Sequence, residues 1–599
     1  MNGVNDFAFK IGTVNGTGSA SANGLLMQAI FRMGIPVSGK NIFPSNIQGL
    51  PTWYEIRVSK DGYTARPSEV DLVVALNPAT YSKDVATVRP GGFLLYDSSW
   101  PLPKELERDG ITILGIPFGR LCVESFEGDR ERTLLRNIAY AGALTALLGI
   151  DEEVVDTLLN QTYGRKPKLL ESNHTAIRLG RDYATQHCPC PLPFHLEKMA
   201  ATGDSILMDG NTACALGAVY AGATVGAWYP ITPATSLMEA FKAFCEKYRV
   251  DKETDDRNYA ILQAEDELAA AGIVIGAGWA GARAFTNTSG PGISLMQEFL
   301  GLAYYTDIPA VFFDIQRCGP ATGMPTRTQQ ADLLSLAYAS HGDTKHPILF
   351  PANPHEAFEM AVQAFDLADR LQTPVFVATD LDIGMNDWMV KRLTWDDAYR
   401  PDRGKVLDAA ALEKVKKFSR YLDVDGDGIA ARTLPGVGGK GAYFVRGSGH
   451  DKHAGYTEDS DAYREVVDRL RRKFAHAATI VPKPACTLRE GADVGLITIG
   501  GCDAAVREAA DKLQAQDVVV DVMRIRAFPF GDEVREFCEA YDTVFVIEQN
   551  RDGQLRSMLA IELGIPRDEM IPVLDYGGMP LTARVVVDAV SGHLAGVPA

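Results

Sequence analysis

Short apolar runs alternate with longer stretches of helical periodicity along most of the chain. In the first region, about residues 7–160, helical patterns span residues 25–30 and 132–148. The strand-like runs of this region are Asp71–Leu76, Gly92–Tyr96 and Ile111–Ile116. Strands that alternate with helices predict a parallel sheet with helices on its faces.

The same alternation occurs twice more along the chain. The second region, about residues 208–381, has strand-like runs at Tyr259–Gln263, Ala310–Ile315 and Pro374–Thr379. The last region, from about residue 493, has runs at Val494–Ile499, Val518–Met523 and Thr543–Ile547. We therefore predict an α/β fold built from three α/β units.

Two stretches interrupt this pattern. Residues 164–196 begin with basic side chains and then contain Pro189, Pro191 and Pro193. Because proline fixes φ and lacks a backbone donor, this composition predicts an extended linker. Residues 386–484 are polar and poorly periodic. The predicted parts are a first α/β domain at 1–163, the linker at 164–196, a second α/β domain at 197–385, a polar extension at 386–484 and a C-terminal α/β domain at 485–599.

The polar extension contains an acidic segment, Asp423–Gly428, with the sequence DVDGDG. Oxygen ligands at alternate positions and a glycine at the turn are typical of the start of a calcium loop. Such a loop ends with a glutamate at its twelfth position, where this chain has Leu434. A solvated acidic turn is therefore the favoured interpretation.

Charge and hydropathy exclude several classes of partner. The 599 residues include 59 basic and 77 acidic side chains, which gives a formal charge of −18. Such a chain repels phosphate backbones, so we expect no nucleic-acid partner. No run of 18 apolar residues predicts a membrane span, and the first residues lack a basic stretch followed by an apolar one. We therefore expect a cytoplasmic protein without a membrane partner.

None of the nine cysteines forms a CxxC pair, and the closest pair, Cys188 and Cys190, is a CxC flanked by prolines. Iron–sulfur clusters need several thiolates close together. The cysteines are therefore interpreted as reduced and mostly buried thiols, and we predict neither a cluster nor another metal site in this chain.

A run of small residues near the N-terminus includes Gly12, Gly16 and Gly18, placed between a predicted strand and a predicted helix. Glycines allow close approach of a phosphate, and a helix N-terminus favours an anion. The spacing GxxxGxG differs from the GxGxxG dinucleotide fingerprint, and the acidic residue expected after a second strand is missing, which argues against a nicotinamide-dependent dehydrogenase. A tightly packed turn is the alternative interpretation.

Four motifs of the second region carry candidate chemistry. The first two are YPITP at Tyr229–Pro233 and QAEDE at Gln263–Glu267. Two prolines hold Thr232 in a defined conformation, which suits recognition of a carboxylate or phosphate, although a tight turn would need the same residues. Adjacent carboxylates at the start of a helix can act in acid–base chemistry or can simply cap that helix.

The other two motifs are TNTSGPG at Thr286–Gly292 and QRCGPATGMPT at Gln316–Thr326. The first is rich in hydroxyl groups and turn formers, as ligand-binding loops often are. In the second, Arg317 directly follows an apolar strand, where α/β proteins bind ligands, and a guanidinium can bind a carboxylate through two parallel hydrogen bonds. A structural ion pair is the alternative for Arg317.

Taken in this order, the motifs resemble those of the α subunit of 2-oxoacid:ferredoxin oxidoreductases with the γ subunit fused at its N-terminus. The resemblance extends over nearly the whole chain, although the N-terminal glycine loop is looser than the family's glycine-rich form. It implies a γ-type α/β domain, a domain that binds the pyrimidine of thiamine diphosphate, and a C-terminal domain like that of transketolase.

The same resemblance implies the reaction and the partners. Family members use thiamine diphosphate to decarboxylate a 2-oxo acid, transfer the acyl group to coenzyme A and pass electrons to ferredoxin. The α subunit supplies the pyrimidine pocket, and a separate β subunit holds the diphosphate, its Mg²⁺ and a [4Fe–4S] cluster. We therefore expect an enzyme that is active only with a β subunit, in a dimer of αβ heterodimers.

Site residues follow from the family's motifs. Spacing to Gly272 assigns the carboxylate that activates thiamine to Glu267 rather than to Glu265. Thr232 and Arg317 would hold the substrate carboxylate. The remaining positions implied by the resemblance are Thr326 as a further substrate contact, Tyr229, Pro230, Ser289, Gly290 and Pro291 at the pyrimidine, and Gly12, Gly16 and Gly18 as a loop for coenzyme A or phosphate.

The fused architecture together with the Asp423–Gly428 segment resembles the branch of the family that acts on 2-oxoglutarate, which implies 2-oxoglutarate as the substrate, converted to succinyl-CoA. Pyruvate and branched-chain 2-oxo acids remain alternatives. A low-potential ferredoxin would also permit the reverse reaction, CO2 fixation as in a reductive tricarboxylic acid cycle. Other open interpretations are a thiamine enzyme with another acceptor and a non-catalytic coenzyme-A-binding or assembly subunit.

Overall fold

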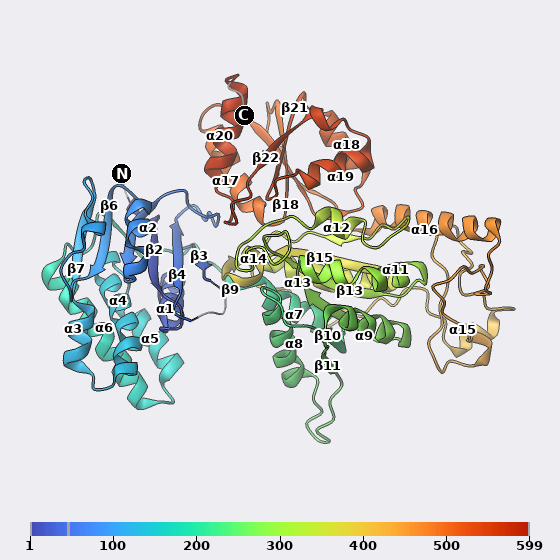
Figure 1. The fold of residues 1–599 in the computed structure, drawn as a ribbon, viewed down its shortest axis with the longest axis horizontal. Helices are drawn as coiled ribbons and strands as arrows, with labels where there is room; N and C mark the ends of the chain where they lie inside the picture. Colours follow the sequence, from blue (N-terminus) through green and yellow to red (C-terminus); the bar gives the residue numbers. More distant parts are fainter. Residues whose placement is uncertain (1–2, 45–47, 597–599) are drawn as a thin grey trace. The chain divides into compact units, whose positions relative to one another are not determined.

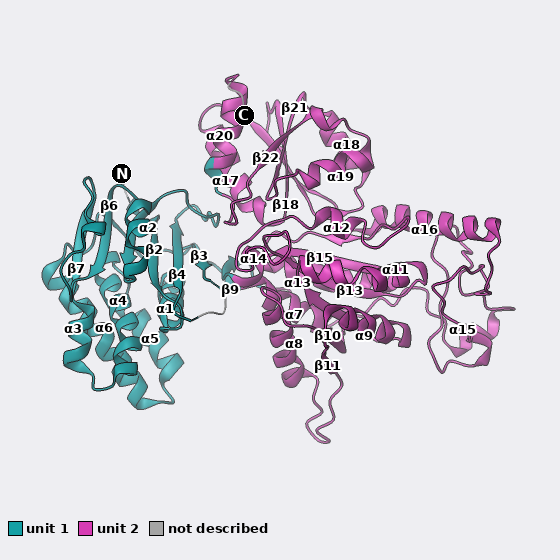
Figure 2. Ribbon diagram, in the orientation of Figure 1, with its two compact units in different colours: residues 1–208, 386–392, 582–584 teal, residues 209–385, 393–581, 585–599 magenta. Residues whose placement is uncertain are grey.

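The computed structural model describes residues 3–44 and 48–596. These residues divide into two compact units (Figure 2), the first made of residues 1–208, 386–392 and 582–584, and the second of residues 209–385, 393–581 and 585–599. Three large sheets with flanking helices confirm the predicted α/β fold class. Among the described residues, no helix combines the length and the apolar character needed to cross a membrane.

The first unit contains a six-stranded sheet in the order β3-β4-β2-β5-β6-β7 (Figure 1). Its strands are β2 (Asp6–Val14), β3 (Val37–Ile42), β4 (Pro51–Ser59), β5 (Val70–Ala75), β6 (Val88–Asp97) and β7 (Thr112–Ile116). Strands β2, β5, β6 and β7 run parallel, and β3 and β4 pair antiparallel at one side. The helices are α1 (Ser19–Arg32), α2 (Tyr81–Thr87), α3 (Phe118–Ser125), α4 (Asp129–Leu148), α5 (Glu152–Tyr163) and α6 (Pro167–His187).

Helix α6 corrects the expected linker at 164–196. Residues 167–187 are helical, and the irregular path is limited to the proline-rich part that follows them. A Cβ at Gly180 would lie 1.8 Å from the carbonyl oxygen of Ala139, and one at Gly142 would lie 2.1 Å from that of Ile177. Small residues on both helices therefore let α4 and α6 pack with their backbones in close approach.

The second unit contains a seven-stranded sheet in the order β11-β10-β12-β13-β15-β14-β20. Its strands are β10 (Val225–Trp228), β11 (Ala260–Gln263), β12 (Ala284–Thr288), β13 (Ala310–Gln316), β14 (Ile348–Leu349), β15 (Pro374–Asp380) and β20 (Ala527–Phe528). All neighbouring pairs are parallel except β14 with β20. The last strand therefore comes from a segment far along the chain.

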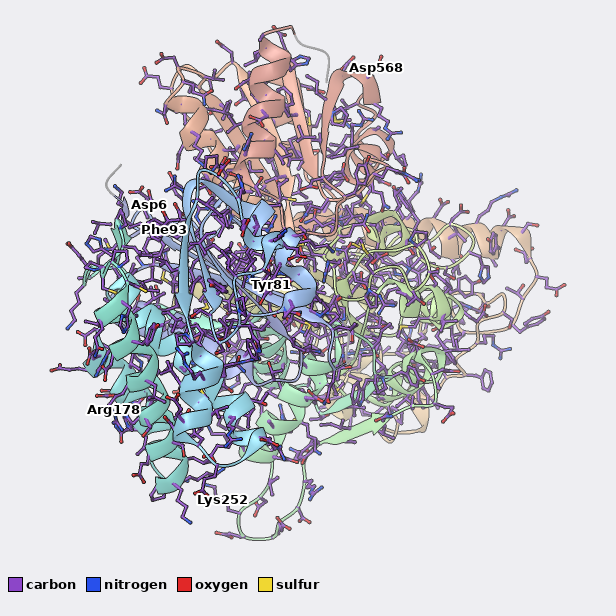
Figure 3. All side chains as sticks on the ribbon, turned by 60° about the vertical axis from the view of Figure 1, so that its left-hand side comes forward. Asp6, Tyr81, Phe93, Arg178, Lys252 and Asp568 are labelled. Carbon is purple, nitrogen blue, oxygen red and sulfur yellow. The ribbon has the colours of Figure 1, made fainter. Side chains whose placement is uncertain are left out.

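Helices cover this sheet on both faces, and α7, α8 and α13 pack together beside it (Figure 1). The helices are α7 (Gly210–Tyr220), α8 (Thr235–Tyr248), α9 (Glu267–Ala280), α10 (Gly290–Leu295), α11 (Gln297–Tyr305), α12 (Leu333–Ala337), α13 (Pro354–Leu371) and α14 (Leu381–Met385). The loop between α8 and β11, which carries Lys252, projects away from the sheet (Figure 3).

The C-terminal part of the second unit forms a five-stranded sheet in the order β17-β19-β18-β21-β22. Its strands are β17 (Ala485–Thr487), β18 (Val494–Ile499), β19 (Val520–Ile525), β21 (Thr543–Glu548) and β22 (Met570–Leu574). Its helices are α17 (Asp503–Gln514), α18 (Asp532–Glu539), α19 (Gln554–Leu563) and α20 (Ala583–Leu594). Gln330 of the preceding region donates from Nε2 to the carbonyl of Ile499 at 3.0 Å, which joins this sheet to its neighbour.

The polar extension is more regular than its sequence predicts, since it contains α15 (Ala409–Lys414) and the 21-residue helix α16 (Ser460–Ile480). A buried ionic cluster attaches it to the rest of the second unit. The Asp307 carboxylate forms ion pairs with Lys473 Nζ at 2.5 Å and with Arg469 Nη2 at 2.8 Å, and the carbonyl of Asp307 accepts from Arg420 at 2.8 Å. Burial alone would raise the pKa of Asp307, but the three cations outweigh it and lower that pKa to about 2.

We predict that Asp307→Asn destabilises the protein by about 3–5 kcal/mol, because it leaves buried cations without their counter-charge. The wild-type stabilisation should be complete above the unfolded pKa of about 4 and should be lost as the pH falls toward 2. Urea unfolding followed by circular dichroism measures both effects. Asp468→Asn, which removes an exposed ion pair with Arg471 on α16, is the control and should cost less than about 1 kcal/mol. Equal effects of the two substitutions would contradict the prediction.

The acidic segment Asp423–Gly428 surrounds a lysine. Carboxylate oxygens of Asp423, Asp425 and Asp427 come within 4.8 Å of one another. Lys405 Nζ lies 2.8 Å from Asp427 Oδ1 and 3.0 Å from Asp425 Oδ2, and it also donates to a backbone carbonyl. The ammonium group thus supplies the positive charge that a cation would supply in a calcium loop.

We predict that Ca²⁺ leaves the melting temperature of the wild-type chain unchanged. Lys405→Met keeps the length of the side chain but leaves the carboxylates unneutralised, so this variant should melt at a lower temperature and should regain stability when Ca²⁺ is added. Differential scanning fluorimetry with and without a chelator measures this response, and the exposed Lys416→Met serves as control. A calcium response of the wild-type chain would contradict the prediction.

Candidate active site

Four of the motifs follow four neighbouring strands. The chain leaves β10 into Tyr229–Pro233, β11 into QAEDE, β12 into the TSGPG loop and β13 into Arg317. These strands are adjacent in the order β11-β10-β12-β13 and are parallel, so their carboxyl ends meet at one edge of the sheet. Strands β11 and β12 lie on opposite sides of β10, which makes this edge a topological switch point, where open α/β sheets bind ligands.

The loop after β10 is held from two sides. Asn211 on α7 donates from Nδ2 to the carbonyl of Pro233 at 2.8 Å, and Asn287 on β12 donates from Nδ2 to the carbonyl of Ala234 at 2.7 Å. The carbonyl of Thr232 accepts from Arg317 Nη1 at 2.6 Å. The structure therefore brings Thr232 and Arg317 together, and the buried amides of Asn211 and Asn287 hold the loop that carries Thr232.

Glu267 is the first residue of α9, and Asp266 caps this helix by accepting from the backbone N–H of Ala269 at 2.6 Å. Only 7% of Glu267 is exposed, whereas Glu265 is exposed to solvent. The helix N-terminus favours the negative charge of Glu267. Of the two candidate carboxylates, Glu267 is thus the one that can act in a site shielded from water.

The TSGPG loop packs directly on Glu267. A Cβ at Gly292 would lie 1.9 Å from Thr288 Oγ1 and 2.9 Å from Glu267 Cγ. Ser289 is fully buried, and Gly290 and Pro291 form the first turn of α10. Gly272, which identifies Glu267 by its spacing, faces the ring of Phe299 on α11. Glycine at 292 is therefore required for the close approach between this loop and the start of α9.

The loop after β13 folds back on itself. Cys318 pairs with Met324 in an antiparallel bridge, and the N–H of Cys318 donates to the carbonyl of Arg327 at 3.0 Å. Thr326 therefore lies beside the chain that carries Arg317, and both residues are 8% exposed. Burial lowers the pKa of Arg317, while the carboxylates of Asp332 and Glu267 oppose that shift.

Several buried polar atoms around this edge lack a hydrogen-bond partner among the described residues. They are Thr286 Oγ1, Asn287 Oδ1, Ser289 Oγ and Arg317 Nε. Unpaired polar atoms in a buried site cost free energy unless a ligand or water binds them. By contrast, the structure leaves Tyr229 and Pro230 exposed at the rim.

The N-terminal glycine loop belongs to the first unit. Gly12 lies inside β2, not after it as the sequence analysis expects, and a Cβ there would lie 3.0 Å from Asp84 Oδ2. Gly16 and Gly18 do form the turn before α1, with φ values of 88° and 86° that favour glycine. Asn137 on α4 holds this turn by donating to the carbonyl of Thr17 at 2.6 Å.

Sequence reasoning missed three polar residues near the site. Asn211 positions the loop after β10, and burial raises the pKa values of the Asp314 and Asp332 carboxyl groups. Asp314 had a detectable signal in the sequence, because it is the one acidic residue in the mostly apolar strand β13. Asn211 and Asp332 had none, because each is an ordinary polar residue at the start of a helix.

Comparisons with known proteins agree with this geometry. Residues 216–397 match a family model described as pyruvate flavodoxin/ferredoxin oxidoreductase, thiamine diphosphate-binding, and residues 8–183 match the pyruvate ferredoxin/flavodoxin oxidoreductase model. The α subunit of a 2-oxoacid:ferredoxin oxidoreductase from Aeropyrum pernix is 30% identical, over 98% of this chain and 97% of that protein. The 2-oxoglutarate synthase subunit KorA of Methanothermobacter thermautotrophicus is 31% identical over 62% of this chain and 94% of its own length.

A solved structure, that of the 2-oxoglutarate:ferredoxin oxidoreductase from Magnetococcus marinus with 2-oxoglutarate, coenzyme A and succinyl-CoA bound, is also similar. It superposes with a TM-score of 0.89 at 27% identity and covers 98% of this chain and all of that one. The matched thiamine diphosphate-binding domain contains the four loops of the site, which defines a thiamine-dependent oxidoreductase subunit. More specifically, the chain belongs to the 2-oxoacid:ferredoxin oxidoreductase family, as an α subunit whose N-terminal region is a fused γ-type domain.

The residues at the sheet edge fit one end of thiamine diphosphate. A pyrimidine needs an apolar slot, a carboxylate near a ring nitrogen and hydrogen-bonding groups at its edge. The buried Glu267, the glycine-containing TSGPG turn and the unpaired Ser289 Oγ provide groups of these kinds. No cluster of metal-ligating side chains other than the acidic segment occupied by Lys405 is found among the described residues.

We predict that Gly292→Ala lowers the turnover of the complete enzyme by at least about tenfold, because the added Cβ pushes Thr288 and Glu267 apart and a displacement of about 1 Å can cost about 100-fold. The matched control is Gly276→Ala on α9, where a Cβ meets nothing within 4 Å. Steady-state rates of the two variants, together with their melting temperatures, test this. A loss of turnover with Gly276→Ala equal to that with Gly292→Ala would show that backbone flexibility, not crowding at the site, is responsible.

Proposed function

We propose that this chain is the catalytic α subunit of an enzyme that oxidatively decarboxylates 2-oxoglutarate in the presence of coenzyme A. The products would be succinyl-CoA, CO2 and reduced ferredoxin. The observation that carries this proposal is the sheet edge at which strands β10 to β13 end. This edge carries the buried Glu267 and also Arg317, whose guanidinium donates to the carbonyl of Thr232. In this proposal, Arg317 and Thr232 would bind the carboxylate of the 2-oxo acid, and Glu267 would contact the ring of the cofactor.

Thiamine diphosphate, when bound, supplies the electron sink that makes loss of CO2 from a 2-oxo acid feasible. In this chain, Glu267 would hold a proton at the pyrimidine ring, and the turn Ser289–Pro291 would orient that ring. Arg317 and Thr232 would fix the 1-carboxylate of the substrate, with Thr326 as a further polar contact. Fixing the carboxylate removes the orientational entropy that would otherwise oppose reaction.

The choice of 2-oxoglutarate rests on the full-length similarity to the Magnetococcus marinus enzyme, whose structure contains 2-oxoglutarate and succinyl-CoA, and on the KorA relatives. Pyruvate is the second candidate, because both matching family models are described by pyruvate oxidoreductases. Branched-chain 2-oxo acids would use the same residues at the reacting end. The direction of the reaction would follow the potential of the ferredoxin, so CO2 fixation by the reverse reaction is part of the proposal.

The proposed partners follow from the similarity of this chain to the α subunit of a 2-oxoacid:ferredoxin oxidoreductase. No cluster of cysteines is found among the described residues, so the electrons need a second protein, a β subunit with a [4Fe–4S] cluster. That subunit would also hold the diphosphate and Mg²⁺, in a dimer of αβ heterodimers. In the first unit, the turn at Gly16 and Gly18 at the start of α1 would bind a phosphate of coenzyme A.

The deciding experiment is anaerobic purification of the complex from its native cells, followed by viologen reduction with coenzyme A and one 2-oxo acid at a time. Activity with 2-oxoglutarate in the complex, and none in the isolated chain, supports the proposal. Activity with pyruvate alone keeps the chemistry and replaces the substrate. Absence of activity with every 2-oxo acid, without a copurifying iron–sulfur protein, supports a non-catalytic assembly role.

We predict that Glu267→Gln lowers turnover of the complex by about 100-fold or more, the usual size of a lost acid–base contribution. Glu265→Gln is the matched control, since it makes the same chemical change two residues away on an exposed side chain. Viologen reduction at saturating substrate measures both. If the two variants were equally active, the assignment to Glu267 would be wrong.

A further inference from the structure

Helix α9 exposes an apolar side. After Glu267, its residues 268–280 have the sequence LAAAGIVIGAGWA, which contains no charged side chain. The buried side of the helix includes Glu267, Val274 and Ile275, and its apolar residues pack in the core of the seven-stranded sheet. The residues of the other side are exposed or half-buried, and they include Leu268, Gly272, Ile273, Gly276, Trp279 and Ala280.

The exposed side follows the period of an α-helix. Positions 268, 272, 276 and 279 succeed one another at intervals of three or four residues, so they form one row along the helix. A helix at the surface of a globular domain usually carries charged or polar residues on such a row. Here Leu268 is 37% exposed and Trp279 is 38% exposed. Contiguous apolar surface of this kind marks a place where another molecule binds.

Two neighbouring helices, α10 and α11, pack against α9 and extend the apolar surface. The ring of the half-buried Phe299 on α11 lies beside Gly272, where an added Cβ would come within 2.8 Å of it. Helix α10 ends at Leu295, which is 54% exposed. We call the row Leu268, Gly272, Gly276 and Trp279, together with Phe299, the α9 face.

The charge of the chain favours a second copy of this chain as the occupant of the α9 face. Each copy has a formal charge of −18, so most surfaces of two copies repel each other. A contact across a two-fold axis brings the same surface of both copies together, so a negative charge near the axis meets another negative charge. Residues 268–280 carry no charge, and two copies can therefore meet along them without this repulsion.

The acidic residues before the helix determine the orientation of such a contact. Glu265 and Asp266 are exposed at the N-terminal end of α9. A two-fold axis perpendicular to the helix makes the two copies of α9 antiparallel. The carboxylates of the two copies then lie about 20 Å apart, because the helix has 14 residues and rises about 1.5 Å per residue. In this arrangement, Leu268 of one copy lies at the level of Trp279 of the other, so large apolar side chains cover each other.

We propose that the α9 face is the contact between two copies of this chain, with the two α9 helices packed antiparallel across a two-fold axis. This inference rests on the proposed assembly as a dimer of αβ heterodimers, and it does not depend on the substrate or on the reaction. Because Glu267 is the first residue of α9, the contact also steadies the helix that carries the proposed catalytic carboxylate.

The test is the number of copies of this chain in the complete complex, measured by native mass spectrometry and sedimentation equilibrium. The wild-type complex should contain two copies. Gly276→Lys places a charge in the middle of the α9 face and spares the fold of the chain, because a Cβ at Gly276 meets no atom within 4 Å. Each contact then buries two unpaired ammonium groups, so the dissociation constant of the dimer should rise by at least about 100-fold and the complex should contain one copy.

Two variants serve as matched controls. Gly592→Lys makes the same change on α20, at another helical glycine with open space around its Cβ, and should keep two copies. Gly276→Ala changes the same backbone position without adding a charge and should also keep two copies. Loss of the second copy with Gly592→Lys would show that the added charge separates the copies wherever it is placed, and would overturn the inference.

A mixture of two variants identifies the occupant. Gly276→Lys and Gly276→Glu should each give one copy per complex, and their mixture should restore a complex with one chain of each kind, because opposite charges then meet across the contact. If the β subunit bound this face instead, it would be lost from both variants and mixing would not recover it. That result, a mixture that stays at one copy, or two copies with Gly276→Lys alone would overturn the inference.

Viologen reduction by the same complexes separates failure of this inference from failure of the proposed function. A wild-type complex with two copies but no activity with any 2-oxo acid, combined with one copy in Gly276→Lys, would reject the function and retain the contact. Wild-type activity with 2-oxoglutarate, combined with two copies in Gly276→Lys, would reject the contact and retain the function.

Discussion

Parallel hydrogen bonding between β10, β11, β12 and β13 determines where this protein can carry out chemistry. Each strand delivers its following loop to the same edge, and the reversal of strand order around β10 opens a place between the loops. The site residues are far apart in sequence, from Thr232 to Thr326, and the parallel strands bring the loops that carry them to one edge. A shift in the pairing of any of these strands would separate Glu267 from Arg317.

Much of this could be predicted from the sequence, because strand ends and motifs coincide. The apolar runs identified the strands that precede Glu267 and Arg317, with boundaries differing by one residue from those of β11 and β13. Turn residues marked the loops that follow. The sequence separates Glu267 from Glu265 only by the spacing to Gly272. The structure adds that Glu267 is buried and Glu265 is exposed.

The remainder depends on contacts that a linear pattern does not contain. The basic residues and prolines of 164–196 predict a linker, but the prolines lie beyond the end of helix α6, and the close packing of α6 on α4 at Gly142 and Gly180 has no signal in a linear pattern. Lys405 and Asp427 are 22 positions apart, so the acidic segment alone does not reveal the ammonium group that neutralises its carboxylates.

The position of β20 has a consequence for how such a chain can be divided into separate genes. This strand pairs with β14 at the edge of the seven-stranded sheet, although it follows β18 and β19 in sequence. A break anywhere between Asp380 and Ala527 would therefore produce two polypeptides that must reassemble before that sheet is complete. A break between Met208 and Gly210 interrupts no strand of the three large sheets, so fission or fusion of coding regions is structurally easiest there.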